Sequence, residues 1–313
     1  MIRWTIPVLL LAACATSPSP AERVRGQAAE HSPPAVSIFT VAHEDDWQLF
    51  MMPDAFRAMD ESQEKAVFSH LTAGDAGKGV TGDPVPYYVA REEGALRAIR
   101  FLANAGDKPG LGSEMRVTEQ MVAGHRLHRV SYANAVIYFL RLPDGFGQGP
   151  GYETTGFQSL QRFMEGKIAT MSAVDASATY AGWSDLQETL AGIITAELVG
   201  GSQLSIRVTE PEASLNPIEH SDHRHTARAM LAVAEHFPCA AVLRYDTYDN
   251  RNRPMNLTGA DLLMHAGIWG ATTSGLGDNF APSTWEPGHF NWLGRMYVRE
   301  ARAKEQCVAA PAK

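Results

Sequence analysis

The fold and the chemistry of this chain both start from one stretch, residues 36–46, which reads VSIFTVAHEDD. Its apolar and β-branched first half has the composition of a strand that is buried on both faces. An imidazole and a run of carboxylates follow directly, and open α/β sheets bind their ligands at the carboxyl ends of their strands. His43 and Asp46 can together hold one side of a divalent metal ion, while Asp45 points elsewhere. The stretch therefore predicts half of a metal site.

A second cluster follows about 180 residues later, in residues 219–223, which read EHSDH. Its histidines, His220 and His223, precede residues 224–237, where apolar side chains recur at the spacing of an amphipathic helix. One histidine can complete a His/Asp/His metal triad, and the other can remain free for proton transfer. The two clusters together predict a catalytic metal site.

The two clusters also carry a resemblance to a known family. Residues 42–46, AHEDD, resemble the Ala-His-Pro-Asp-Asp motif of the PIG-L/LmbE-like zinc-dependent N-acetylglucosaminyl deacetylases. Residues 220–223, HSDH, resemble that family's His-x-Asp-His motif. Further blocks resemble the family in the same order, at residues 71–75, 91–93 and 140–145. The resemblance implies an α/β fold, a Rossmann-like three-layer sandwich around a mostly parallel sheet.

Two positions depart from the family pattern. Glu44 replaces the usual proline, and Trp47 stands where many members have a third acidic residue. Neither position is expected to ligate the metal, so both changes concern the groups that support the ligands. We expect an altered site geometry or substrate rather than lost chemistry.

The resemblance implies a role for each residue of the two clusters. His43, Asp46 and His223 would ligate Zn²⁺ and leave one position open for water, whose pKa zinc lowers to about 7. Asp45 would be the base that takes the proton of this water as it attacks an amide carbonyl. His220 would be the acid that serves the oxyanion or the leaving amine, and Asp222 would orient it. Iron(II) or cobalt could fill the same ligand set.

Two further residues are predicted to bind substrate. Arg91 falls in a predicted helix over residues 88–103, where the alternative is an ion pair on the helix surface. Asp144 falls in Pro143-Asp144-Gly145, where the alternative is an ordinary turn residue. The resemblance implies that Arg91 contacts the substrate and that Asp144 holds a sugar hydroxyl near the metal.

Composition limits the class of protein and of partner. The chain has 313 residues, 45% of them hydrophobic, and a formal net charge of −8. This length can bury the core of one domain, which we place at residues 35–313. The acidic balance and the lack of a dense Lys/Arg patch argue against a nucleic-acid partner.

The N-terminal region is expected to lie outside the fold. Residues 1–14 have the features of a bacterial secretory signal ending in Leu-Ala-Ala-Cys, which predicts a lipid anchor on Cys14. The alternative is an ordinary cleaved signal. Residues 15–34 are rich in Ser and Pro and predict a tether. The expected location is the periplasmic side of a bacterial membrane, the outer membrane being favoured, with contact through the anchor alone. Cys239 and Cys307 would then be either bridged or two free thiols.

Other segments received structural interpretations. Residues 145–156, rich in glycine, predict either a lid over the pocket or a plain connection. Ser184 is expected to cap a helix through residue 197, and residues 246–253 to form an exposed loop. Seven further histidines are interpreted as structural, and the C-terminal aromatic residues as a packing patch with sugar stacking as the alternative. These residues are His70, His125, His128, His225, His236, His265 and His289, with Trp285, Trp292 and Tyr297.

The sequence as a whole predicts a secreted zinc hydrolase that removes the acetyl group from an N-acetylated amino sugar or its glycoconjugate. One alternative is a zinc-containing sugar-binding protein with weak turnover, suggested by Trp47. The other is an amidase that acts on a non-sugar acyl amide. Neither the substrate nor the oligomeric state follows from the sequence.

Overall fold

The structure, a computed structural model, describes residues 35–60, 64–106, 113–198, 200 and 202–301. Its contacts divide the chain into residues 1–33 and 34–313, and only the second unit is described below. The predicted signal, the tether, Cys14 and Cys307 lie outside the described residues. Cys239 is disulfide-bonded. Among the described residues, no helix combines the length and the apolarity needed to cross a bilayer.

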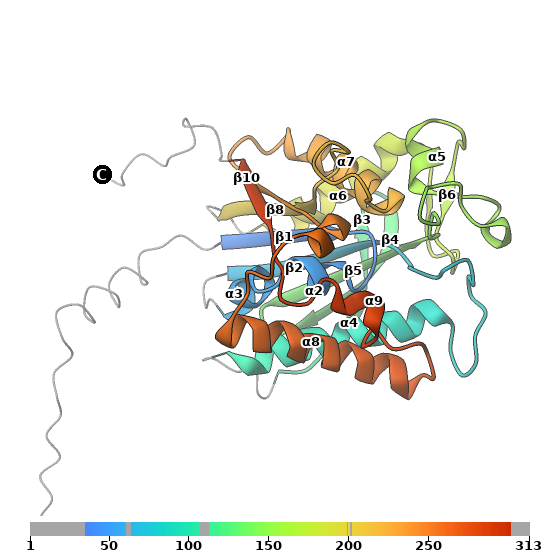
Figure 1. Cartoon of the computed structure of the whole chain (residues 1–313). Coiled ribbons are helices and arrows are strands. Elements are labelled where there is room, and N and C mark those ends of the chain that lie inside the picture. The colour runs from blue at the N-terminus through green and yellow to red at the C-terminus, as the bar shows by residue number, and fades with distance from the viewer. Residues whose placement is uncertain (1–34, 61–63, 107–112, 199, 201, 302–313) are drawn as a thin grey trace, which may run out of the picture. The chain divides into compact units, whose positions relative to one another are not determined.

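An eight-stranded sheet forms the centre of the domain (Figure 1). Five neighbouring strands, β9, β8, β1, β2 and β5, run parallel, while β10 at one edge and β4 and β3 at the other are antiparallel. In sheet order the strands are β10 (Val298–Ala301), β9 (Ala241–Tyr245), β8 (Gln203–Thr209), β1 (Ala35–Val41), β2 (Glu64–Thr72), β5 (Ala135–Leu142), β4 (His125–Tyr132) and β3 (Arg116–Val122). The predicted mostly parallel α/β sandwich is therefore confirmed.

Helices cover both faces of this sheet (Figure 1). One face carries α5 (Leu160–Met164), α6 (Trp183–Glu197) and α7 (Ser221–Ala234). The other carries α2 (Asp46–Phe50), α3 (Asp54–Asp60), α4 (Tyr87–Ala105), α8 (Gly259–Asp278) and the short α9 (Pro287–Phe290). Smaller elements are the 3₁₀ turns η1 (Glu153–Thr155) and η2 (Tyr248–Asn252) and the two-stranded β6 (Met171–Ser172) and β7 (Thr179–Tyr180).

Strand β1 shows why its sequence is apolar at nearly every position. Val36 and Ile38 point into the core shared with α6 and α7, whereas Phe39 and Val41 point into the core shared with α2, α4 and α8. All four are at most 1% exposed, and each such side chain stabilises the fold by about 1.5–3 kcal/mol. A central parallel strand is covered on both faces, so it cannot alternate apolar and polar residues.

Several local predictions need correction. Helix α6 has Gly182 at its N-cap and no side-chain cap, so the cap predicted at Ser184 is wrong. The helix after the second cluster begins at Ser221, three residues earlier than expected, with His220 as its N-cap. The loop after β9 is exposed only in part: Arg251 and Asn252 are exposed, whereas Asp246, Thr247 and Asn250 are at most 2% exposed.

Candidate metal centre

The two sequence clusters meet at the carboxyl ends of the parallel strands. His43 follows β1, and the loop that follows its neighbour β8 leads to His220 and His223 at the start of α7. Asp144 follows β5 and Tyr248 follows β9. Parallel strands bring their carboxyl ends to one edge of the sheet, which is why residues from distant parts of the chain converge there.

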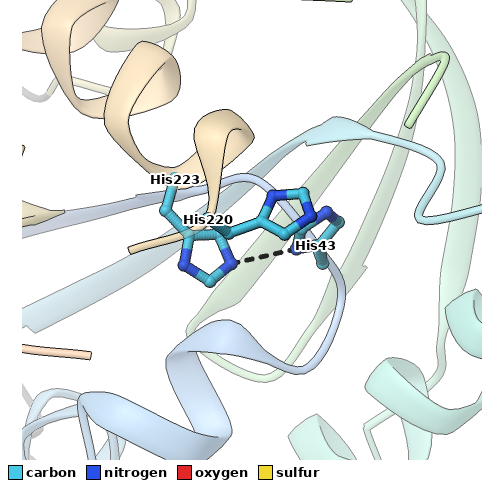
Figure 2. A group of neighbouring side chains, drawn as sticks. All are labelled: His43, His220 and His223. Carbon is cyan, nitrogen blue, oxygen red and sulfur yellow. Dashed lines mark hydrogen bonds between the residues drawn. The ribbon is translucent and has the colours of Figure 1, made fainter. Parts of the chain in front are cut away.

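His43, Asp46 and His223 form a compact triangle of ligand atoms. His43 Nδ1 lies 3.0 Å from His223 Nε2, a contact drawn as a dashed line in Figure 2. Asp46 Oδ1 lies 2.9 Å from His223 Nε2 and 3.5 Å from His43 Nδ1. Ligands about 2.0–2.1 Å from a tetrahedral zinc ion are about 3.3–3.4 Å apart. The three atoms of the predicted ligand set therefore lie close together, with two edges slightly shorter than those around a tetrahedral zinc ion.

A carboxylate lies on the far side of each histidine ring, opposite the nitrogen that faces this triangle. Glu219 Oε1 lies 2.6 Å from His223 Nδ1, so Nε2 of that ring turns inward. Asp222 Oδ2 lies 3.6 Å from His43 Nε2, so Nδ1 of that ring turns inward. Asp222 is itself held by the Gly145 N–H at 2.7 Å. Such outer carboxylates orient metal-ligating histidines and make them stronger ligands.

The electrostatics of the cluster favour a positive charge. Burial lowers the pKa of His223, but Asp46 and Glu219 outweigh it and raise that pKa to about 10. Burial likewise opposes a charged Asp46, yet the pKa of this carboxyl is held well below its usual range by His223 and His43. His43 Nε2 and Asp222 Oδ1 are also buried without a hydrogen-bond partner, although neither atom belongs to the triangle. The residues present thus fit a bound cation.

A second grouping of ligand atoms involves His220. His43, His220 and His223 offer nitrogens within 4.8 Å of one another, as do His43 and His220 with oxygens of Asp144 and Asp222. His220 Nδ1 accepts a hydrogen bond from the Asp222 N–H at 3.1 Å, which caps α7. Burial, with the charge of His43, lowers the pKa of His220 to about 3. In this neutral ring, Nε2 is the atom that carries the proton.

Asp222 lies closer to His43 than to His220. The distance from its Oδ2 to His220 Nδ1 is 3.9 Å, and that nitrogen is already occupied by a backbone N–H. The orienting role predicted for Asp222 thus has His43 as its nearer partner.

Arg91 lies beside the triangle, on α4, and contacts two acidic residues. Its Nη2 lies 2.5 Å from Asp45 Oδ1, and its Nε lies 2.8 Å from Glu44 Oε2. The other oxygen of Asp45, Oδ2, lies 4.0 Å from His289 Nε2. Burial raises the pKa of Glu44 to about 8, and the Arg91 guanidinium offsets this only in part. Arg91 is no surface ion pair, because its side chain is 16% exposed.

Asp144 is a turn residue that also lies in the wall of the cavity. Its Oδ1 accepts from the Phe146 N–H at 2.8 Å, as a turn residue does. Asp144 also lines the cavity beside the triangle and is 8% exposed. Its carboxylate can therefore reach a ligand without leaving the turn.

The cavity beside the metal ligands has a volume of about 160 Å³. This is less than the roughly 300–1,000 Å³ of pockets that enclose a drug-sized ligand, so it suits the reacting end of a substrate. The residues that line it are His43, Asp45, Asp46, Leu49, Arg91, Asp144, His220, Tyr248, His289 and Trp292. The rings of Tyr248 and Trp292 stack with centroids 5.0 Å apart, which gives one wall an aromatic character.

Comparison with known proteins adds a loose likeness in fold. No family model matches the sequence, and no curated protein matches it either. Among solved structures, the chain is similar to N,N'-diacetylchitobiose deacetylase from Pyrococcus horikoshii complexed with its inhibitor MPG. The two share 14% identity over 83% of this chain and 80% of that one, with a TM-score of 0.40. A TM-score this low carries no information about the site. The chemistry of the site is therefore inferred from the residues of this chain.

Several site residues were not found from the sequence. The contact between Glu219 and His223 could have been predicted from the sequence. Glu219 lies four residues before His223, and side chains at this spacing lie on the same side of a helical turn. His289 was interpreted as structural, yet it lines the cavity and its Nδ1 contacts Glu286. Tyr248 carried no signal, because a single tyrosine in a polar loop has no pattern. By contrast His265 is buried in the core, as predicted.

Proposed function

We propose that this protein is a zinc-dependent deacetylase that hydrolyses the N-acetyl group of an amino sugar or its glycoconjugate. The observation that carries the proposal is the triangle of His43 Nδ1, Asp46 Oδ1 and His223 Nε2, with edges of 2.9–3.5 Å beside a polar cavity. A zinc ion held there supplies Lewis-acid chemistry, which acidifies water and polarises a carbonyl group. Three protein ligands leave a further position open, as catalytic sites require.

Asp45 is the residue placed to take a proton. Arg91 holds its Oδ1 and leaves Oδ2 toward the cavity, where an attacking water would lie. The carboxylate then holds that proton for the leaving amine, which departs badly as an anion. His289 lies across the cavity at 4.0 Å from Asp45 and is a second group that could pass a proton to the amine.

His220 is the residue placed to stabilise the acyl oxygen. With Nδ1 occupied by the Asp222 N–H, the neutral ring turns its Nε2–H toward the cavity that it lines. A donor aimed at an oxygen that gains charge during the reaction is worth roughly 10²–10³ in rate. We therefore assign His220 a hydrogen-bonding role, which does not need a charged imidazole.

The rest of the lining suits a sugar better than a plain acyl amide. The Asp144 carboxylate can accept from a hydroxyl, and Arg91 can donate to one. Tyr248 and Trp292 offer rings against which a pyranose can stack. Trp47, which suggested a binding protein without turnover, does not line this cavity: it is buried against Phe68 and donates to His70 Nε2 at 3.1 Å.

The proposal includes the exported location, with Cys14 as the site of lipid attachment. Support for it remains the sequence of residues 1–14, which resembles a lipoprotein signal. An exported, membrane-anchored deacetylase would meet glycoconjugates of the cell envelope.

The deciding experiment is acetate release by the zinc-loaded full-length protein from a panel of N-acetylated sugars, glycan fragments and non-sugar acetamides. Asp45→Asn serves beside it as the variant that keeps the ligands but lacks the base. We expect release from amino sugars that Asp45→Asn abolishes while zinc stays bound. Release from the non-sugar amides alone would identify an amidase. Sugar affinity without release in either protein would identify a binding protein and overturn the proposal.

A further inference from the structure

Glu44 is a buried acidic side chain beside the site that the proposed mechanism does not use. It follows His43 in the loop after β1 and is 2% exposed. Its Oε2 accepts a hydrogen bond from Arg91 Nε at 2.8 Å. Removing a carboxyl group from water is costly unless the group is hydrogen-bonded. The buried position of Glu44 therefore depends on its hydrogen-bond partner. That partner is the residue that also contacts Asp45.

Arg91 links Glu44 to the candidate base. Its Nη2 donates to Asp45 Oδ1 at 2.5 Å, so Nε and Nη2, which lie on one edge of the guanidinium, contact the two neighbouring carboxyl groups. The guanidinium is planar and rigid, which means that fixing the Nε edge also fixes the direction of Nη2. The contact with Glu44, a residue that takes no part in the reaction, therefore sets the position from which Arg91 binds Asp45.

The loop after β2 is shaped around this contact. Gly74 has a φ of +50°, and a Cβ placed on it would lie 2.7 Å from Glu44 Oε2 and 2.8 Å from Arg91 Nε. Any other residue there would have to displace the pair. The backbone therefore closes over Glu44 and Arg91 and limits the alternative positions of both.

From this geometry we propose that Glu44 is a positioning residue for the deacetylase reaction, acting through Arg91 on Asp45. The inference rests on the proposed function and adds to it a residue that touches neither metal nor substrate. Glu44 holds Arg91 so that Asp45 keeps Oδ1 engaged and Oδ2 free in the cavity. The family that the sequence resembles has proline at this position. In this chain, Glu44 instead supports the base Asp45 through Arg91.

A neighbouring ion pair, between Glu92 on the same helix and Arg141 on β5, supplies a matched control. Arg141 Nε and Nη2 donate to Glu92 Oε1 and Oε2, both at 2.7 Å, and Glu92 is 5% exposed. This carboxylate–guanidinium contact resembles that of Glu44 in burial and length but does not line the cavity. Glu92→Gln therefore measures how the loss of a buried carboxylate affects α4 when the cavity lining is unchanged.

The kinetic test compares Glu44→Leu with Glu44→Gln, which keeps an acceptor oxygen. We expect Glu44→Leu to lower kcat about 10- to 100-fold, as loss of an outer supporting group does, with zinc content unchanged. Glu44→Gln should restore most of the rate, and Glu92→Gln should leave kcat intact. On an Arg91→Ala background, Glu44→Leu should cost nothing further, because it acts only through Arg91. A further loss by the full single-variant factor would overturn the proposal.

A second readout does not depend on turnover. In protein labelled with ¹⁵N-arginine, the buried Arg91 Nε–H should give a slowly exchanging resonance, lost in Glu44→Leu and kept in Glu44→Gln and Glu92→Gln. Its retention in Glu44→Leu would overturn the positioning role, even if the wild-type protein released no acetate and the proposed function itself failed. Should Glu44→Leu not fold, Glu44→Asp, shorter by one methylene, is expected to lose the same contact and the same rate.

Discussion

Two buried clusters of charged residues in this domain differ in how their charges are balanced. The first surrounds Glu197 at the end of α6. Its Oε1 accepts from Arg129 at 2.9 Å and from Tyr138 at 2.6 Å, and its Oε2 lies 2.5 Å from Lys65. Every oxygen has a donor, and two cations face one anion. This cluster is complete as the chain folds it.

The second cluster, the candidate metal centre, is not complete. Asp46, Asp144, Asp222 and Glu219 converge on three histidines, and among the residues that the structure describes no lysine or arginine forms an ion pair with these four carboxylates. His43 Nε2 and Asp222 Oδ1 have no hydrogen-bond partner. Buried polar groups are rarely left unpaired, so each exception calls for an explanation. The contrast indicates that the first cluster serves stability, whereas the second is arranged for a cation that the chain does not itself supply.

The largest effect is expected from Asp46→Asn, which replaces a charged ligand by a neutral amide. Loss of an outer partner of a metal ligand costs roughly 10–100-fold in affinity, and loss of the ligand itself should cost more. We expect the variant to purify without zinc and to release no acetate. The measurement is zinc content by mass spectrometry together with acetate release. Unchanged zinc affinity would instead point to the set of His43, His220 and His223.

His220→Ala should affect turnover strongly and folding weakly. Loss of the Nε2–H donor should lower kcat about 10²–10³-fold. Loss of the helix cap should lower the free energy of unfolding by only about 1 kcal/mol. The control is His220→Asn, whose Oδ1 can accept from the Asp222 N–H but whose side chain reaches no further into the cavity. It should recover stability without recovering rate. Zinc loss in His220→Ala would mean that this ring is a ligand.

The sequence predicts the fold of this protein well because its signals are local. The residues before His43 have the apolar composition of a strand that is buried on both faces. The strand that they form, β1, lies inside the sheet between β8 and β2. Pro53 separates α2 from α3, as expected of a residue that cannot continue a helix. The helix predicted from the apolar spacing of residues 88–103 is α4, Tyr87–Ala105.

The candidate site was only partly predictable, because some of its contacts join segments with no shared pattern. His43, Asp46 and His223 could be proposed as ligands from their spacing, and the structure brings them together. His289 could not, since its place across from Asp45 depends on how the chain after α8 returns to the sheet. Glu44 showed only as a departure from a motif, and its contact with Arg91 required the packing of α4.

The smallest effect is expected from Glu197→Gln, which tests the first cluster, around Glu197. At neutral pH we expect a loss of about 2 kcal/mol in the free energy of unfolding, discounted for the partial exposure of its cationic partners, with zinc content and kcat unchanged. Burial opposes the charge of Glu197, but Arg129, Lys65 and Tyr138 outweigh it and lower its pKa. A lowered pKa stabilises the fold above the unfolded value of about 4.3, and this stabilisation is lost as the pH falls through the folded pKa. Urea unfolding at pH 7 and pH 3 should thus show a smaller difference between the two proteins at pH 3 than at pH 7. A difference that stayed constant would mean that the Glu197 charge does not stabilise this cluster.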